Sequence, residues 1–268
     1  MSWQPAHKAH AIERVSITFV FESELPSKQM DRLLNAVAAI APSQGMTTIS
    51  EDHELDLTAA AQPIAGMNFA PSQSVPIGKT FQSVINGQTR EAAAIHNKQF
   101  SYISTNYIRW ADFRQRVDNI VGSVLSTALE SAYLDSLKIE YWDRFVFSGD
   151  IDKCRYGELL KESKYSPGFI GGQEGLFHSH VGFFADSGKS LRRLVNLNLD
   201  AVDLRGTSGR TYRSVGIYTM VQDSFTHEGA PVNAAAALST SDVMHDILKG
   251  ILVDVISSTM ADRISLKQ

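Results

Sequence analysis

The chain has 268 residues, of which 43% are hydrophobic and 20% are charged, which is a typical globular composition. This composition excludes a globally disordered chain, a collagen-like chain and a coiled coil, and the length is enough to bury a core without disulfide bonds. Lysine and arginine number 25 and aspartate and glutamate 29, giving a formal net charge of −4 that counts against a general nucleic-acid coat.

Cysteine usage and hydropathy exclude further classes of protein. Cys154 is the one cysteine, which excludes an intramolecular disulfide and a zinc site with two thiolates, and we expect it to be a packed side chain. Residues 1–8 lack the apolar region of a secretory signal, and the longest apolar runs are far shorter than the roughly 20 residues of a membrane helix. We therefore expect a cytoplasmic protein without membrane contact.

Apolar alternation and helical spacing predict the elements of the first half. We expect a strand over residues 15–21 and a helix over 30–41 that Ser27 caps. Residues 43–76, with the acidic cluster 51–54, predict an irregular connection with one short strand. The further elements are a hairpin that turns at Asn86-Gly87, a strand over 100–105, a long helix over 110–132, a strand over 137–145 and a short helix over 152–164.

The second half begins after a glycine-rich turn at residues 167–172. Three alternating runs there predict a meander of strands. Ser239 with Asp242 resembles a capping box in front of a long helix over 243–260. The strands of the meander are expected over 177–184, 195–200 and 215–222.

These elements predict an α+β fold in which antiparallel sheets are covered by long amphipathic helices. Each half passes from strands into one long helix. The chain is therefore interpreted either as two related halves, residues 1–166 and 167–268, or as one continuous domain.

Several segments carry a resemblance along most of the chain. They are the strand 15–21, the Tyr- and Trp-rich approach 107–113 to the central helix, the strand 137–144, the late strand 215–223 and the helix 243–260 with His245. In this arrangement the chain resembles a sporadically distributed family of uncharacterised bacterial proteins of about this length. In that family the strand after the central helix carries Arg-Tyr followed by Asn, where this chain has Glu140-Tyr141 and Asp143.

The resemblance implies no established reaction, substrate or cofactor, so we assign no cofactor. The charge reversal at Glu140 counts against an anion site shared with the family. The patchy occurrence of the family implies a mobile or defence-associated gene that acts with a partner protein.

His178 and His180 are candidate metal ligands. Residues two apart in a strand point to one face, so both imidazoles can reach one metal ion. The alternative is a pair of partly exposed histidines on the polar face of a strand. The candidates for a third ligand are Asn196, Asn198, Asp200, His227 and His245.

A row of charged residues is the candidate ligand site. Such residues on a curved sheet can line a cavity for a phosphorylated ligand, and the alternative is a solvated sheet face. The candidate ligand-binding residues are Lys138, Glu140 and Arg144 on one predicted strand and Arg192, Arg193 and Arg213 around the later hairpins.

The predicted C-terminal helix has a wide apolar arc from Ile247 to Ile256, which either contacts another chain or packs into the protein's own core. No catalytic motif assembles in the sequence. We therefore expect a non-catalytic binding or interaction protein of the bacterial cytoplasm, part of a defence or toxin–antitoxin type system. It would recognise a partner protein, a second copy or a small anionic ligand. The alternative is an enzyme or sensor for a phosphorylated or nucleotide-like ligand in a charged sheet cavity, assisted by a metal at His178 and His180.

Overall fold

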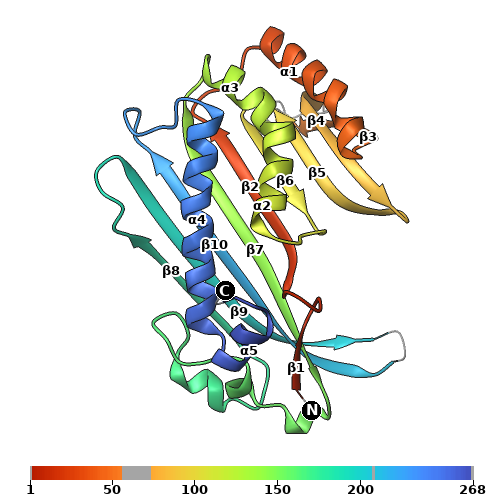
Figure 1. Ribbon diagram of the computed structural model, residues 1–268, viewed down its shortest axis with the longest axis vertical. Coiled ribbons are helices and arrows are strands. Elements are labelled where there is room, and N and C mark those ends of the chain that lie inside the picture. Colours follow the sequence, from red (N-terminus) through yellow and green to blue (C-terminus); the bar gives the residue numbers. More distant parts are fainter. Residues whose placement is uncertain (1, 56–73, 207–208, 267–268) are drawn as a thin grey trace, which may run out of the picture.

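Ten antiparallel strands form one sheet in the computed structural model, which describes residues 2–55, 74–206 and 209–266 (Figure 1). Nine of these strands follow the order β3-β4-β5-β6-β2-β7-β10-β9-β8, and β1 pairs with the end of β7. The strands are β1 (Ser2–Pro5), β2 (Ile12–Phe21), β3 (Thr48–Leu55), β4 (Ser74–Ile85), β5 (Gln88–His96), β6 (Gln99–Ser104), β7 (Leu134–Ser148), β8 (His178–Ala185), β9 (Leu191–Arg205) and β10 (Thr211–Phe225).

Helices cover one face of the sheet. In Figure 1, α4 crosses in front of β7 and β10, and α2 lies in front of β2 and β6. α1 packs on α3 and β4. In the described part of the chain, no helix is long and apolar enough to cross a membrane. The helices are α1 (Ser27–Ile40), α2 (Trp110–Val117), the π-helical turn η3 (Asp118–Gly122), α3 (Ser123–Leu129), α4 (Ala234–Val255) and α5 (Ser258–Arg263).

Alternation along the strands decides which side chains face the helices. On β2, Val15, Ile17 and Phe19 are buried beneath the helices, and on β7 Ile139 and Tyr141 are buried in the same layer. From Lys138 to Arg144, the side chains between the buried positions of β7 are polar or amphipathic and half-buried. The sheet therefore has one packed face and one open face, as is common for antiparallel sheets.

β7 connects the strands of the two predicted halves. It pairs with β2 on one side and with β10 on the other, so both halves contribute to one continuous sheet. The α+β fold with an antiparallel sheet is confirmed. The prediction of long amphipathic helices is not confirmed, because 42% of the described residues are in strands and 32% are in helices. Two related halves with a boundary after residue 166 stay a prediction.

The acidic cluster 51–54 lies in a strand, so the prediction of an irregular connection is wrong for this segment. β3 pairs with β4, and the Glu51 carboxylate lies 3.4 Å from the Lys79 ammonium nitrogen on the neighbouring strand. Pairing with β4 satisfies the backbone groups on one side of the edge strand β3, and such long-range pairing leaves no mark in a local pattern. Residues 56–73 of the expected connection lie outside the described residues.

The predicted helix over residues 152–164 is wrong. This segment forms two 3-10 turns, η4 (Ile151–Lys153) and η5 (Tyr156–Glu158), and the backbone after them is not helical. The Lys161 N–H donates to the Val255 carbonyl (2.9 Å), and the Ser257 N–H donates to the Leu159 carbonyl (2.7 Å). These hydrogen bonds to the end of α4 replace the local bonds of a helix.

Both predicted helix caps are wrong. α1 begins after Pro26 and has no side-chain cap, so Ser27 is its first helical residue. α4 begins earlier than predicted because the Asn233 side chain accepts a hydrogen bond from the Ala236 N–H (2.9 Å). Ser239 therefore lies inside the helix.

Candidate functional site

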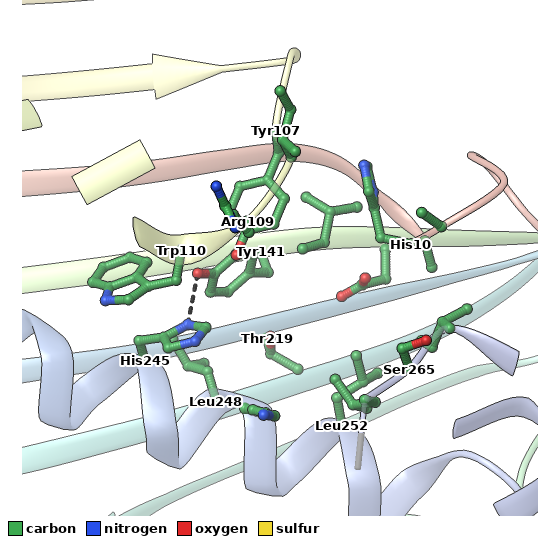
Figure 2. A pocket seen from close by; sticks show the side chains of 18 of the residues that line it. His10, Tyr107, Arg109, Trp110, Tyr141, Thr219, His245, Leu248, Leu252 and Ser265 are labelled. Atoms are coloured by element: carbon green, nitrogen blue, oxygen red, sulfur yellow. Dashed lines mark hydrogen bonds between the residues drawn. The ribbon is translucent and has the colours of Figure 1, made fainter. Parts of the chain in front are cut away.

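A cavity of about 490 Å³ opens on the helix-covered side of the sheet (Figure 2). β7 and β10 form its floor, and its walls come from α4, from residues 107–109 before α2, and from the segments 9–12 and 264–266. Figure 2 shows Tyr107 on one side of the cavity and Leu248 of α4 on the other. Segments far apart in the sequence thus enclose one space.

Asp143 lies at the floor of the cavity and is almost completely buried. Its exposed fraction is 3%, and its Oδ1 atom has no hydrogen-bond partner. Its neighbours in the sheet are Ile12 on β2 and Ile217 on β10, whose side chains have no hydrogen-bond donor. Burial and the nearby charge of Glu13 raise the pKa of Asp143 to about 7. The carboxyl group can therefore change its charge near neutral pH.

His245 of α4 lines the cavity and contacts two aromatic residues. The Tyr141 hydroxyl oxygen lies 2.9 Å from Nδ1 of His245, and the Trp110 ring stacks on the imidazole. The Trp110 Nε1–H donates to Oδ1 of Asp242 (2.8 Å), which connects α2 to α4. Burial lowers the pKa of His245 to about 4, so this imidazole is neutral at pH 7.

Tyr107 and His10 form another wall. The Tyr107 ring packs edge-on against the rings of Tyr141 and His10, with centroids 5.8 Å and 5.7 Å away. Burial raises the pKa of Tyr107, and burial with the charge of His7 lowers the pKa of His10, so both side chains are neutral at pH 7. The described residues contain three buried side-chain N or O atoms without a hydrogen-bond partner. Two of them, Nδ1 of His10 and Oδ1 of Asp143, belong to residues lining this cavity.

The predicted ligand-binding residues lie on two faces of the sheet and not in this cavity. Alternation puts four of them on the open face and two on the helix-covered face. The open face carries Lys138, Glu140, Arg144 and Arg192, and the helix-covered face carries Arg193 and Arg213. The structure therefore does not bring the six together.

These charged side chains have partners within the protein. Glu140 accepts hydrogen bonds from Ser16 (2.9 Å) and Tyr218 (2.7 Å), and its carboxylate lies 3.1 Å from the Lys138 ammonium nitrogen. Burial acts to raise the pKa of Glu140, but these contacts outweigh burial and lower it. Three of the arginines are in ion pairs, Arg144 with Glu13, Arg193 with Asp223 and Arg213 with Asp203, and the fourth, Arg192, stacks over the Phe184 ring.

His178 and His180 project from the open face of the edge strand β8, beside β9. His178 contacts the Asp200 carboxylate, and His180 contacts the Asn198 side chain. In the part of the chain that the structure describes, no three His, Cys, Asp or Glu side chains are grouped so that they could hold a metal ion. Asp200 and Asn198, two of the candidates for a third metal ligand, therefore lie beside the histidines, but they do not complete such a group of three.

The apolar arc of the C-terminal helix packs into the protein's own core. Leu248, Ile251, Leu252, Val255 and Ile256 are all buried. Cys154 is buried as well, and burial raises the pKa of its thiol to about 11, which disfavours the nucleophilic thiolate at pH 7.

The cavity residues Asp143, His10, Trp110 and Tyr107 were not predicted as a site. One sequence signal could have found Asp143. It occupies a position of β7 that alternation assigns to the apolar face, between the buried Tyr141 and Phe145. A carboxylate is rarely fully buried without a partner, because burial disfavours its charge.

No protein-family model matches the chain, and no curated protein matches it either.

Proposed function

We propose that this chain is a binding protein that holds a small organic molecule in the cavity above Asp143. The observation that carries the proposal is a buried carboxyl group whose Oδ1 atom has no partner and which lines a cavity. A buried polar group without a hydrogen bond costs about 1–3 kcal/mol of stability. Because a ligand that donates a hydrogen bond to Asp143 offsets this cost, the unpartnered atom supports a binding site.

The cavity suits a small ligand in size and composition. Its volume of about 490 Å³ lies within the usual range for small-molecule pockets, roughly 300–1,000 Å³. Leu248 and Leu252 of α4 present apolar surface, and Tyr107, Trp110 and Tyr141 present aromatic rings. A few polar atoms in a mainly apolar wall are typical of a site that holds an apolar body in one orientation.

The proposal refines the sequence-based prediction of a non-catalytic binding protein. The buried carboxyl group of Asp143 disfavours the small anionic ligand of that prediction at the floor of this cavity. Recognition of a partner protein or a second copy, the cytoplasmic location and a role in a defence system stay predictions. The enzyme or sensor for a phosphorylated or nucleotide-like ligand also stays a prediction.

Native mass spectrometry of the chain, purified without denaturation from the cells that produce it, tests the proposal. Ala111 lines the cavity and is exposed on the first turn of α2, so Ala111→Trp should obstruct the cavity without disturbing the core. We expect a bound small molecule on the wild type and a bound fraction reduced about tenfold or more in Ala111→Trp.

The matched control is Ala235→Trp. Ala235 is exposed on the first turn of α4 and is not part of the cavity lining, so this variant should keep the bound molecule. Equal occupancy of the wild type and Ala111→Trp, including no bound molecule in either, would overturn the proposal.

A further inference from the structure

We infer that the ligand carries a protonated amine or amidine whose N–H groups bind the Asp143 carboxylate, with an apolar body along α4. This inference rests on the proposed function, because it names the chemical class of the molecule in the same cavity. Three observations support it: the charges near Asp143, the aromatic walls, and the unpartnered acceptor atoms.

Lys249 and Arg109 line the same cavity, but among the described residues no cation is one of the groups that act on the Asp143 carboxyl group. The effects that act on its carboxyl group are burial and the negative charge of Glu13, and both oppose ionisation. Arg144 follows Asp143 in the strand, but it lies on the open face, where it donates to Glu13 (2.7 Å) and Ser214 (3.1 Å). Arg109, 75% of whose side chain is exposed, donates to Asp112 at the edge of the cavity (2.9 Å). A ligand cation would supply the charge that the carboxylate lacks.

The walls of the cavity are suited to such a cation. Tyr107 and Tyr141 line it, and aromatic rings attract ammonium and guanidinium groups. Both tyrosines have raised pKa values because they are buried, so their hydroxyl groups stay neutral and can accept an N–H. A phosphate or carboxylate ligand would instead meet the Asp143 carboxyl group at the floor of the cavity.

The unpartnered atoms favour a group with several N–H donors. Oδ1 of Asp143 accepts hydrogen bonds when ionised, and Nδ1 of the neutral His10 ring, which also has no partner, accepts one in the tautomer that carries its proton on Nε2. A primary ammonium group has three donors, an alcohol has one, and a quaternary ammonium group has none. This difference separates attraction by charge alone from binding through N–H groups.

Titrations of three probes by ligand-observed NMR at pH 8 test the inference. The probes share one apolar body: 2-phenylethylamine, 2-phenylethanol and trimethyl(2-phenylethyl)ammonium. We expect the wild type to bind the primary amine about tenfold or more tightly than either other probe. Asp143→Asn keeps the size of the side chain and removes its negative charge, so it should abolish this preference.

The outcomes separate this inference from the proposed function. If all three probes bind the wild type equally but bind Ala111→Trp more weakly, the cavity binds ligands and the cation inference is wrong. If the quaternary probe equals the primary amine, the N–H groups play no part and the inference is also wrong. If no probe distinguishes the wild type from Ala111→Trp, the inference is overturned, and the proposed function is decided by native mass spectrometry of the same two proteins.

A pH series provides a second readout. The Asp143 pKa of about 7 means that the carboxylate population grows between pH 6 and pH 8 while the probe amine stays protonated, so amine affinity should rise over this range. In Asp143→Asn the affinity should stay constant, and a parallel rise there would contradict the assignment. The other ionisable side chains around the site are Glu13, Tyr107, Arg109, Tyr141, Asp246 and Lys249. His10 and His245 also lie there, and their lowered pKa values keep both neutral over most of this range.

Discussion

The imidazole of His245 lies parallel to the indole of Trp110, with ring centroids 4.5 Å apart and an interplanar angle of 1°. Trp110 begins α2 and His245 lies in the middle of α4, so this contact joins two helices that are far apart in the sequence. Tyr141, on strand β7, also contacts the imidazole, because its hydroxyl oxygen lies 2.9 Å from Nδ1 of His245. The imidazole is thereby shielded from water, which explains its low pKa and gives the cavity a neutral wall.

The first prediction is that Asp143 and His245 have opposite effects on the pH dependence of stability. The pKa of Asp143 is raised from 3.8 to about 7, so its contribution to stability is present below pH 3.8 and is lost as pH rises through 7. The pKa of His245 is lowered from 6.5 to about 4, so its contribution is present above pH 6.5 and is lost as pH falls through 4. Between about pH 4 and pH 6.5, the two residues change the free energy of unfolding in opposite directions, each by about 1.4 kcal/mol per pH unit.

Single variants should expose each slope. From pH 4.5 to 6, the stability of Asp143→Asn should rise with pH relative to the wild type, and that of His245→Gln should fall. At pH 8, the free energy of unfolding of Asp143→Asn should exceed that of the wild type by up to about 4 kcal/mol. The reason is that the variant has no buried carboxylate whose ionisation destabilises the folded state. Urea unfolding at each pH measures these differences, and the double variant should return to the slope of the wild type. If the stability of both single variants changes with pH as that of the wild type does, the two residues do not have opposite effects and the prediction is wrong.

Much of the fold follows from local patterns. The alternation of Val15, Ile17 and Phe19 predicted β2, because a half-buried strand must place its apolar side chains on one face. The hairpin of β4 and β5 was predicted by its turn, and Asn86 and Gly87 do adopt positive φ angles of 53° and 74°. These features depend on residues that are neighbours in the sequence.

The cavity could not be predicted in this way. It needs His10, Tyr107, Asp143 and His245 together, and these residues meet only because β7 pairs with β2 and β10 while α4 packs across them. Strand order is set by long-range packing, which single-sequence patterns do not show. The same argument explains why the role of Arg193 was not predicted. It was expected to bind a ligand, but it pairs with Asp223 on the neighbouring strand, and the sequence does not show that these strands are neighbours.

The second prediction is that Arg193 stabilises the fold and does not bind ligand. Its Nε and Nη2 groups each donate to the Asp223 carboxylate at 2.6 Å, and Asp223 is 0% exposed. Arg193→Met leaves this carboxylate buried without its partner, which should lower the free energy of unfolding by about 3–5 kcal/mol. The measurement is urea unfolding at pH 7.

The double variant Arg193→Met with Asp223→Leu removes both charges and should recover most of this loss, because an apolar pair of similar volume can replace a buried ion pair. Binding of 2-phenylethylamine by the double variant should equal that of the wild type. A stable Arg193→Met protein with impaired binding would instead favour the ligand role predicted from the sequence.

The third prediction concerns Gly78, which lies on β4 directly between Asp52 on β3 and His96 on β5. Side chains two strands apart start roughly 10 Å from each other, so they meet only if the residue between them leaves room. Here Nε2 of His96 lies 2.9 Å from Oδ2 of Asp52, and the Thr80 hydroxyl donates to the same oxygen (2.5 Å).

Gly78→Ala should therefore be strongly destabilising. Gly78 has a φ of +157°, and a Cβ atom there would lie 2.0 Å from the Ile95 carbonyl oxygen, which belongs to the backbone and cannot move aside easily. We expect a loss of about 2–4 kcal/mol in the free energy of unfolding, from the strained backbone and from displacement of β5. Gly172→Ala is the matched control, because a Cβ atom there meets nothing within 4 Å and its φ is not positive, so its stability should change by about 0.5 kcal/mol or less. Equal stability of the two variants would show that β4 and β5 can separate at this point without loss, and that the contact between Asp52 and His96 does not depend on the glycine between them.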